Sequence, residues 1–206
     1  MPRIYTSIGK RSGDLILAAL ALLACAPFLL AIAAVVRLDV GRPVLFRQRR
    51  PGLNGTPFML LKFRTMRNTR DSSGNPLADA DRLTRIGRFL RSTSLDELPE
   101  LWNVLKGDMS LVGPRPLLMR YLDRYTPEQA RRHDVRPGMT GLAQVGGRNA
   151  LTWQQKFALD IEYVDNCSWR LDVTILARTA RDVLARRNVN QPGHATAQEF
   201  MGTPSA

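Results

Sequence analysis

Two adjacent acids, Asp96 and Glu97, lie in a segment that is otherwise rich in basic residues. Arg88 and Arg91 precede them, and Arg115 follows. Arginine binds phosphate oxygens through paired hydrogen bonds, and Mg²⁺ is held by one or two carboxylates together with substrate phosphates. An ionised aspartate can also attack phosphorus. The pattern therefore indicates phosphate chemistry, in which Asp96 could serve as a nucleophile or a metal ligand and Glu97 could act as a general base.

The same acids have a structural alternative. Ser94 is followed three residues later by Glu97, which is the spacing of a capping box at the start of a helix. Acids in a first helical turn also stabilise the helix by their charge alone. Pro99 complicates this pattern, because a proline so close to the start displaces the first turn. The two roles are compatible if the helix start presents Asp96 to a phosphate.

Composition narrows the class of protein. The chain has 206 residues and a formal net charge of +12, so its surface attracts nucleic acid, anionic lipid or phosphorylated substrates. Cys25 and Cys167 are too few for a disulfide framework, which favours a reducing compartment. With His133 and His194 as the only histidines, a zinc site would lack its usual ligands. Any bound metal should be a hard ion with oxygen ligands, and we expect one catalytic domain.

The longest uncharged run is Leu15–Val36, with 22 residues. As a helix it would be about 33 Å long, enough for a hydrocarbon core of about 30 Å. Basic residues flank both ends, and the positive-inside preference is met at both only if the segment turns back. Pro27, preceded by Ala26, offers a place for that turn. The sequence allows a re-entrant helix broken at this pair or a spanning helix.

A cleavable signal is a further alternative for this segment. Leu22–Cys25 resembles a lipoprotein processing site. Cleavage there would leave the apolar stretch Pro27–Val36 at the new N-terminus and export a strongly basic body. The flanks therefore favour an uncleaved anchor.

Beyond the anchor, the pattern predicts an α+β fold that is mostly helical. The basic segment Arg37–Arg70 should lie against anionic headgroups. Two strand-like stretches, Pro43–Gln48 and Pro57–Phe63, flank the turn residues of Pro51–Gly55 and predict a hairpin. Residues 68–81 are typical of a loop, and residues 136–148 form a glycine-rich segment that can approach a ligand closely. Helices are expected at residues 96–105, 116–125, 127–134 (capped by Thr126), 153–164 (capped by Thr152) and 171–187.

The expected organisation has three parts. Residues 1–37 form the membrane-anchoring helix, residues 38–190 the catalytic domain and residues 191–206 a loose tail. The last expected helix carries charged and apolar residues on one face, so it could pack against the core or a membrane. We therefore expect amphipathic helices at the membrane interface.

Seven motifs extend over nearly the whole chain. They are Lys10-Arg11, Arg50–Leu53, Lys62–Met66, Ser94–Pro99, Asn103–Ser110, Val112–Pro116 and Arg136–Gly141. Each motif alone is common, but their combination is specific. Together they resemble the bacterial sugar transferase family, in the form of its small monotopic, PglC-like phosphoglycosyl transferases.

The resemblance implies an enzyme of the bacterial inner membrane with its catalytic domain on the cytoplasmic face. Such enzymes move a sugar-1-phosphate from a UDP-sugar to undecaprenyl phosphate, with Mg²⁺ as cofactor, and release UMP. Asp96 matches the nucleophile that carries the phosphosugar covalently, and Glu97 matches the partner that helps to activate the acceptor. The reaction is the first membrane step of glycan assembly, so downstream glycosyltransferases are expected partners.

Charge pattern and resemblance together indicate which basic residues bind substrate or phosphate. The candidates are Lys62, Arg64, Arg88, Arg91, Arg115 and Arg148, the last for the nucleotide. Lys62, Arg64 and Arg88 could equally face lipid headgroups. The resemblance also implies a re-entrant helix broken at a Ser-Pro pair, where this chain has Ala26 before Pro27 and lacks the serine hydroxyl.

The sugar and the class of function have alternatives. Gly193–Thr196 and Glu199–Gly202 look like the end of enzymes that use UDP-N,N′-diacetylbacillosamine, so we expect an N-acetylated amino sugar. A non-enzymatic protein that tethers polyanions to the membrane would also explain the charge, but it leaves Asp96 and Glu97 without a role. Nucleic acid is not an expected partner, because aromatic residues do not alternate regularly with the basic ones as a series of stacking platforms would.

Overall fold

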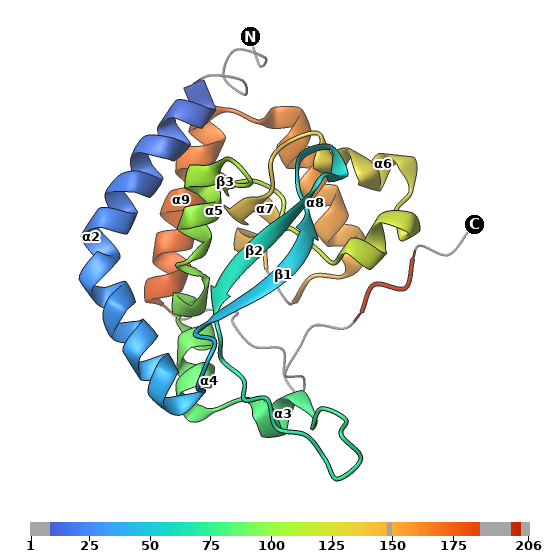
Figure 1. Cartoon of the computed structure of the whole chain (residues 1–206). Helices are drawn as coiled ribbons and strands as arrows, with labels where there is room; N and C mark the ends of the chain where they lie inside the picture. The colour runs from blue at the N-terminus through green and yellow to red at the C-terminus, as the bar shows by residue number, and fades with distance from the viewer. Residues whose placement is uncertain (1–8, 148–149, 186–198, 203–206) are drawn as a thin grey trace.

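The computed structural model describes residues 9–147, 150–185 and 199–202. One long helix, α2, runs along the side of a body made of short helices and two small sheets (Figure 1). This arrangement confirms the expected α+β class with mostly helical content. In chain order the elements are α2 (Lys10–Asp39), β1 (Leu45–Pro51), η2 (Leu53–Gly55), β2 (Pro57–Phe63), α3 (Asp79–Arg82), α4 (Arg85–Ser92), η3 (Leu95–Glu97), α5 (Glu100–Lys106), β3 (Ser110–Val112), η4 (Met119–Arg124), α6 (Pro127–Ala130), η5 (Arg131–His133), β4 (Gly138–Thr140), α7 (Leu142–Val145), α8 (Trp153–Asn166) and α9 (Trp169–Leu184).

Helix α2 continues through Ala26 and Pro27, so within this fully described helix the expected break does not occur. A proline removes one backbone hydrogen bond but need not end a helix whose neighbouring turns are intact. In Figure 1, α2 instead bows around the body. Leu23 and Leu30 on this helix are 76% and 71% exposed, whereas a soluble core helix would bury them. Its length, composition and exposure together indicate that α2 is associated with a membrane.

Both ends of α2 are fixed to the same body. Near its start, Lys10 forms a buried ion pair with Asp172 of α9. One turn later, Asp14 accepts a hydrogen bond at 2.6 Å from the serine that begins β3. Near its end, Val36 is completely buried in a cluster that includes Phe63 of β2. The helix therefore cannot move away from the body at either end without breaking buried contacts.

The predicted hairpin is confirmed. Strands β1 and β2 pair antiparallel along their whole length, and β1 extends as far as Pro51. Asn54 and Gly55 in the connecting η2 turn have φ values of 53° and 73°, which suits the turn residues found there. Asn103 of α5 attaches the hairpin to the body, because its side chain bonds the backbone of Leu61 at 3.1 Å and of Met59 at 2.8 Å. Strand β2 is thereby held beside α5.

The helix predictions are confirmed in part. Thr152 begins α8 with a capping box to Gln155, as expected from its position before the first turn. The stretch at 116–125 forms only the 3-10 helix η4, because Pro114 and Pro116 keep the preceding chain extended. Residues 127–134 divide into α6 and η5, and the glycine-rich segment contains β4 and α7 instead of being irregular. Helices α3 and α4 were not predicted.

The C-terminal tail is not loose where the structure describes it. Phe200 is only 3% exposed and packs edge-on against Tyr121 and Phe157, with ring centroids 5.7 and 4.9 Å away. Arg124 of η4 pairs with Glu199 and donates to the backbone oxygen of Phe200. The prediction of a loose tail is therefore wrong at Phe200, whose ring packs into an aromatic cluster of the body.

Candidate active site

Gly87 lets helix α4 cross the end of strand β2 at very short distance. A Cβ at this position would lie 2.0 Å from the backbone oxygen of Thr65, so a side chain does not fit. Thr84 caps the helix by accepting a hydrogen bond from Gly87 N at 2.8 Å. One turn further, Arg91 Nε donates to Thr65 Oγ1 at 3.0 Å. The crossing thus holds the Arg91 side chain close to the segment that carries Asp96 and Glu97.

A sharp turn, not a capped helix, presents the acid pair. Ser94 has a left-handed φ of 57° and makes no side-chain capping bond, so the predicted capping box is wrong. Asp96 and Glu97 lie in the 3-10 helix η3. Helix α5 begins only at Glu100, directly after Pro99. The physical reason is that the Glu97 side chain accepts hydrogen bonds from Lys62 and Arg115 instead of from the backbone N–H of Ser94.

Glu97 is the centre of a charge network. Its carboxylate accepts a hydrogen bond from Lys62 Nζ of β2 at 2.6 Å and pairs through both oxygens with the Arg115 guanidinium. Lys62 Nζ also lies 3.2 Å from Oε1 of Glu100, which is only 2% exposed. The network therefore joins β2, η3, α5 and the loop that follows β3.

The three acids of this site differ in proton affinity. Burial raises the pKa of Asp96 to about 6, and the neighbouring charge of Glu97 adds to the rise. Burial also raises the pKa of Glu100 to about 7. Burial acts in the same direction on Glu97, but Arg115 and Lys62 outweigh it and hold its pKa well below the usual range. Glu97 is therefore ionised at neutral pH, whereas Asp96 and Glu100 titrate close to it.

Asp96 lines a cavity of about 640 Å³, which we call the cationic cavity. The residue is 8% exposed and, among the described residues, its carboxylate makes no hydrogen bond or ion pair. Basic side chains outnumber acidic ones on the wall. They are Arg50, Lys62, Arg64, Arg82, Arg91 and Arg115, against Asp79, Asp96 and Glu97. This excess of positive charge suits a phosphorylated ligand.

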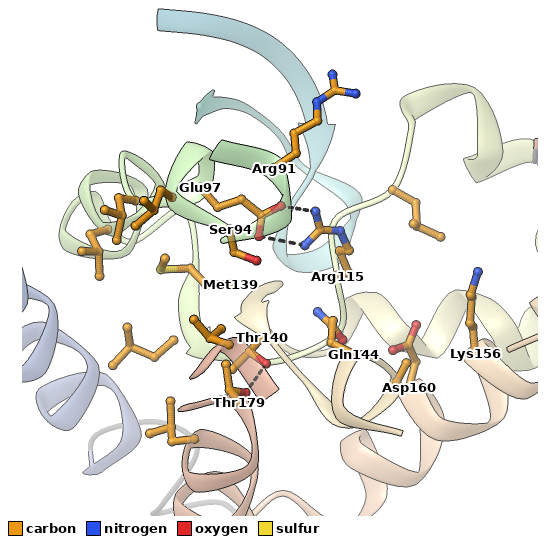
Figure 2. Close-up of a pocket in the computed structure, with 18 of the residues that line it drawn as sticks. Arg91, Ser94, Glu97, Arg115, Met139, Thr140, Gln144, Lys156, Asp160 and Thr179 are labelled. Atoms are coloured by element: carbon orange, nitrogen blue, oxygen red, sulfur yellow. Dashed lines mark hydrogen bonds and ion pairs between the residues drawn. The ribbon is translucent and has the colours of Figure 1, made fainter. Parts of the chain in front are cut away.

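A second cavity of about 500 Å³ shares Arg91, Glu97 and Arg115 with the cationic cavity (Figure 2). We call it the apolar cavity, because most of its remaining wall consists of hydrophobic side chains. They are Leu95, Leu98, Leu101, Leu111, Leu117, Met139, Ala143, Trp153, Leu176 and Val183. The Glu97–Arg115 pair is therefore a wall common to two chemically different spaces.

The close contact between strands β3 and β4 positions the loop that carries Arg115. Strands β3 and β4 run parallel, and the loop after β3 also bonds to β4: Gly113 N donates to Thr140 O at 2.8 Å, and Gly138 N donates to Pro114 O at 3.0 Å. A Cβ on Gly138 would lie 2.1 Å from Gly113 N. The glycines predicted to let the backbone approach a ligand thus let it approach the loop that carries Arg115.

Residues 5–186 match the bacterial sugar transferase family. The chain belongs to this family. The uncharacterized sugar transferase EpsL of Bacillus subtilis is 56% identical over 194 residues, which cover 94% of this chain and 96% of that protein. The UDP-glucose:undecaprenyl-phosphate glucose-1-phosphate transferase of Caulobacter vibrioides is 45% identical, over 91% of this chain and 74% of that protein. The undecaprenyl-phosphate galactose phosphotransferase of Salmonella typhimurium is 39% identical over 89% of this chain, but over only 44% of its own length.

Membership of the sugar transferase family makes the chain a transferase and sets aside a non-enzymatic tether for polyanions. Three of the predicted basic residues, Lys62, Arg91 and Arg115, lie at the acid pair of this sugar transferase. Arg148, predicted for the nucleotide, lies outside the described residues. The sequence prediction therefore located the centre of the charge network.

Two other predicted basic residues have different positions. Arg64 lines the cationic cavity, but its guanidinium donates to backbone oxygens of Val40 at 2.6 Å and Arg42 at 2.8 Å. It thereby ties the end of α2 to the hairpin. Arg88 lies exposed on α4 and lines neither cavity.

Sequence reasoning missed two residues of the candidate site. Glu100 follows Asp96 by four residues and Glu97 by three, a spacing that places side chains on one helical face and could have indicated it. Gln144, which lines the apolar cavity, lies in the glycine-rich segment, and nothing in its local sequence indicates burial. Tertiary packing alone brings it to the site.

Proposed function

We propose that this sugar transferase moves a sugar-1-phosphate from a UDP-sugar to undecaprenyl phosphate and releases UMP. The names of the Caulobacter and Salmonella relatives specify an undecaprenyl-phosphate acceptor, and the first of them specifies a UDP-sugar donor. The observation that carries the proposal is Asp96, a buried carboxylate that opens into a cavity with an excess of basic side chains. Such a site can bind a diphosphate and attack it.

The proposed reaction has two halves. In the first, an oxygen of Asp96 attacks the β-phosphorus of the donor, the bond from that phosphorus to the bridging oxygen breaks, and UMP leaves with the electron pair. In the second, an oxygen of the acceptor phosphate attacks the same phosphorus. The bond to Asp96 then breaks, which restores the carboxylate and leaves the sugar on a polyprenyl diphosphate.

The charge network supports a positioning role for Glu97. Lys62 and Arg115 can bind diphosphate oxygens, and Glu97 holds both of them in place. Because its pKa lies well below the usual range, Glu97 has little affinity for a proton and is poorly suited to be the general base. We therefore propose that Glu97 positions the cations. Arg91 and Arg115 then stabilise the negative charge that develops on the transferred phosphate.

We propose Mg²⁺ as the cofactor, with Asp96 as its protein ligand. Among the described residues, no group of three acidic, histidine or cysteine side chains could hold a metal on its own. Mg²⁺ is commonly held by one or two carboxylates plus substrate phosphates, so one unpaired carboxylate in a phosphate-binding cavity fits an ion that binds together with the donor. When bound, the ion supplies positive charge that neutralises the diphosphate.

We propose that the bowed helix α2 lies in one leaflet of the membrane, with both of its ends and the body on the cytoplasmic face. Both ends of α2 are fixed to one body, through Lys10 at the start and Val36 near the end. A helix that crossed the bilayer in this arrangement would carry the charged body into the hydrocarbon, which is strongly unfavourable. The basic residues at both ends favour the cytoplasmic side.

For the sugar, we propose an N-acetylated amino sugar such as N,N′-diacetylbacillosamine. The support is the resemblance of the tail motif at Glu199–Gly202, one residue of which packs into the body. The names of two relatives specify glucose and galactose for those proteins, so UDP-glucose and UDP-galactose are the competing donors. Exclusive use of either hexose would contradict this part of the proposal.

The full chain in detergent micelles, incubated with a panel of UDP-sugars, Mg²⁺ and undecaprenyl phosphate, tests the function. We expect UMP release and, without acceptor, an intact-mass increase equal to one phosphosugar. Asp96→Asn should abolish both signals, whereas Asp123→Asn, a change at an exposed acid outside both cavities, should retain them. Undiminished UMP release by Asp96→Asn would overturn the nucleophile assignment.

A further inference from the structure

The apolar cavity adjoins the membrane helix. Leu98, Leu111 and Met139 line this cavity and also pack in one cluster with Ala21 and Leu22 of α2. In Figure 2 the hydrophobic side chains gather toward α2 and α9, whereas Glu97 and Arg115 close the opposite side. A ligand in this cavity therefore meets hydrocarbon-like surface toward the membrane helix and charge toward the acid pair.

Gln144 is a buried polar group without a partner in this cavity. Its side chain belongs to a residue that is 9% exposed, and neither its Oε1 nor its Nε2 has a hydrogen-bond partner among the described residues. The nearby hydroxyls of Thr140 and Thr179 satisfy each other at 2.7 Å. A buried amide left unpaired costs free energy. Gln144 and Arg115 both line this cavity, so the unpaired amide indicates that a polar group of the ligand binds there.

We propose that the apolar cavity binds the acceptor lipid, with the lipid phosphate at Gln144 and Arg115 and the first isoprenyl units along Leu176 and Val183 of α9. This inference rests on the proposed function, because it assigns one of its two substrates. Phosphate oxygens accept hydrogen bonds from Gln144 Nε2 and from the guanidinium. The apolar wall removes the isoprenyl units from water.

The division between the two cavities favours the lipid over the donor as occupant. Asp96 and the larger set of basic residues line the cationic cavity, which suits the diphosphate of a nucleotide sugar. The apolar cavity has neither Asp96 nor Lys62 on its wall. Because Glu97 and Arg115 line both cavities, an acceptor phosphate held at this shared wall lies next to the phosphosugar carried by Asp96.

A pair of identical substitutions on α9 tests the assignment. Val183→Trp fills the apolar end of the cavity, whereas Val173→Trp adds the same bulk on the outer face, where Val173 is 55% exposed. We expect Val183→Trp to raise the KM for undecaprenyl phosphate about tenfold or more, with adduct formation from the UDP-sugar alone changed by less than about twofold. Val173→Trp should leave both rates near those of the unmodified protein.

Gln144→Leu provides a second test with little change in volume. Loss of one hydrogen bond to a charged phosphate should raise the KM for the acceptor about tenfold, without slowing adduct formation. If either cavity variant slows adduct formation as much as transfer, the donor occupies this cavity and the proposal is overturned. Thermal unfolding of each variant separates a folding defect from a binding defect.

Photocrosslinking of the unmodified full chain tests the lipid site without any substitution and without a measurement of turnover. Farnesyl phosphate with a terminal diazirine should label peptides of α5 or α9 that line the cavity, and undecaprenyl phosphate should compete. Labels confined to other surfaces would overturn the assignment. If no UDP-sugar yields UMP but the cavity is labelled, the lipid site is supported and the proposed reaction fails.

Discussion

Asp96→Asn is expected to stabilise the protein at neutral pH while it removes the proposed nucleophile. Burial, with a further contribution from Glu97, raises the pKa of Asp96 from 3.8 to about 6. The folded protein therefore binds this proton more tightly than the unfolded chain does. The stability that the proton contributes is fully present below about pH 4 and is lost as the pH rises through about 6.

The size of the effect follows from the two pKa values. Each pKa unit corresponds to about 1.36 kcal/mol, so the rise from 3.8 to about 6 costs the ionised state about 3 kcal/mol of unfolding free energy. Asparagine has nearly the same shape and no charge. Asp96→Asn should therefore recover most of this free energy above about pH 7 and almost none at pH 4. For a chain of this size, the gain corresponds to a Tm increase of about 6 °C or more.

Thermal unfolding of the full chain in detergent micelles, followed by circular dichroism at pH 4 and at pH 7.5, measures this difference. Asp123→Asn is the matched control, because this acid is exposed and its replacement should change stability by less than about 0.5 kcal/mol. A lower Tm for Asp96→Asn at pH 7.5, or the same gain at both pH values, would refute the argument that burial raises the pKa of Asp96.

Three further outcomes test other parts of the structure. The rate of adduct formation in single-turnover experiments should halve near pH 6 as the pH falls, because attack requires ionised Asp96; a midpoint near pH 4 contradicts this reasoning. Glu97→Gln removes one cause of the raised pKa of Asp96 and releases Lys62 and Arg115. The midpoint of the pH dependence of adduct formation should therefore move to lower pH, and the rate at pH 8 should fall about tenfold or more. An unchanged pH profile would mean that Glu97 neither raises this pKa nor positions the cations. Phe200→Ala should cost about 3 kcal/mol in thermal unfolding, since it empties the centre of an aromatic cluster, and no change in Tm would show that the tail does not stabilise the body.

Local patterns predicted the elements whose causes lie within a few residues. The turn at Pro51–Gly55 formed because Asn54 and Gly55 readily adopt positive φ. Thr152 began α8 because its hydroxyl reaches a backbone N–H three residues later. The run Leu15–Val36 is part of α2 because a long apolar segment without charge forms a membrane helix. None of these outcomes depends on distant contacts.

The sequence indicated where the charged residues of the candidate site lie, but it could not predict the ion pairs between them. The partners of Glu97 lie 35 and 18 residues away along the chain, in Lys62 and Arg115. Ion pairs with them replaced the local capping bond that Ser94 offered, which is why the capping prediction failed. Gln144 was missed for the same reason, since its burial results from the packing of segments that are remote in sequence.

The cost of Asp96 to stability and its proposed reactivity have the same cause. Lys62 pairs with both Glu97 and Glu100, and Arg115 pairs with Glu97, whereas neither cation forms an ion pair with Asp96. A carboxylate held in an ion pair would have to break that pair before it attacked phosphorus, whereas Asp96 can attack through one oxygen while the other binds the proposed Mg²⁺. The excess of basic side chains around the cavity offsets the repulsion between the ionised nucleophile and the donor phosphates. Placing the cations on neighbouring acids therefore holds positive charge near the phosphates without neutralising the attacking group.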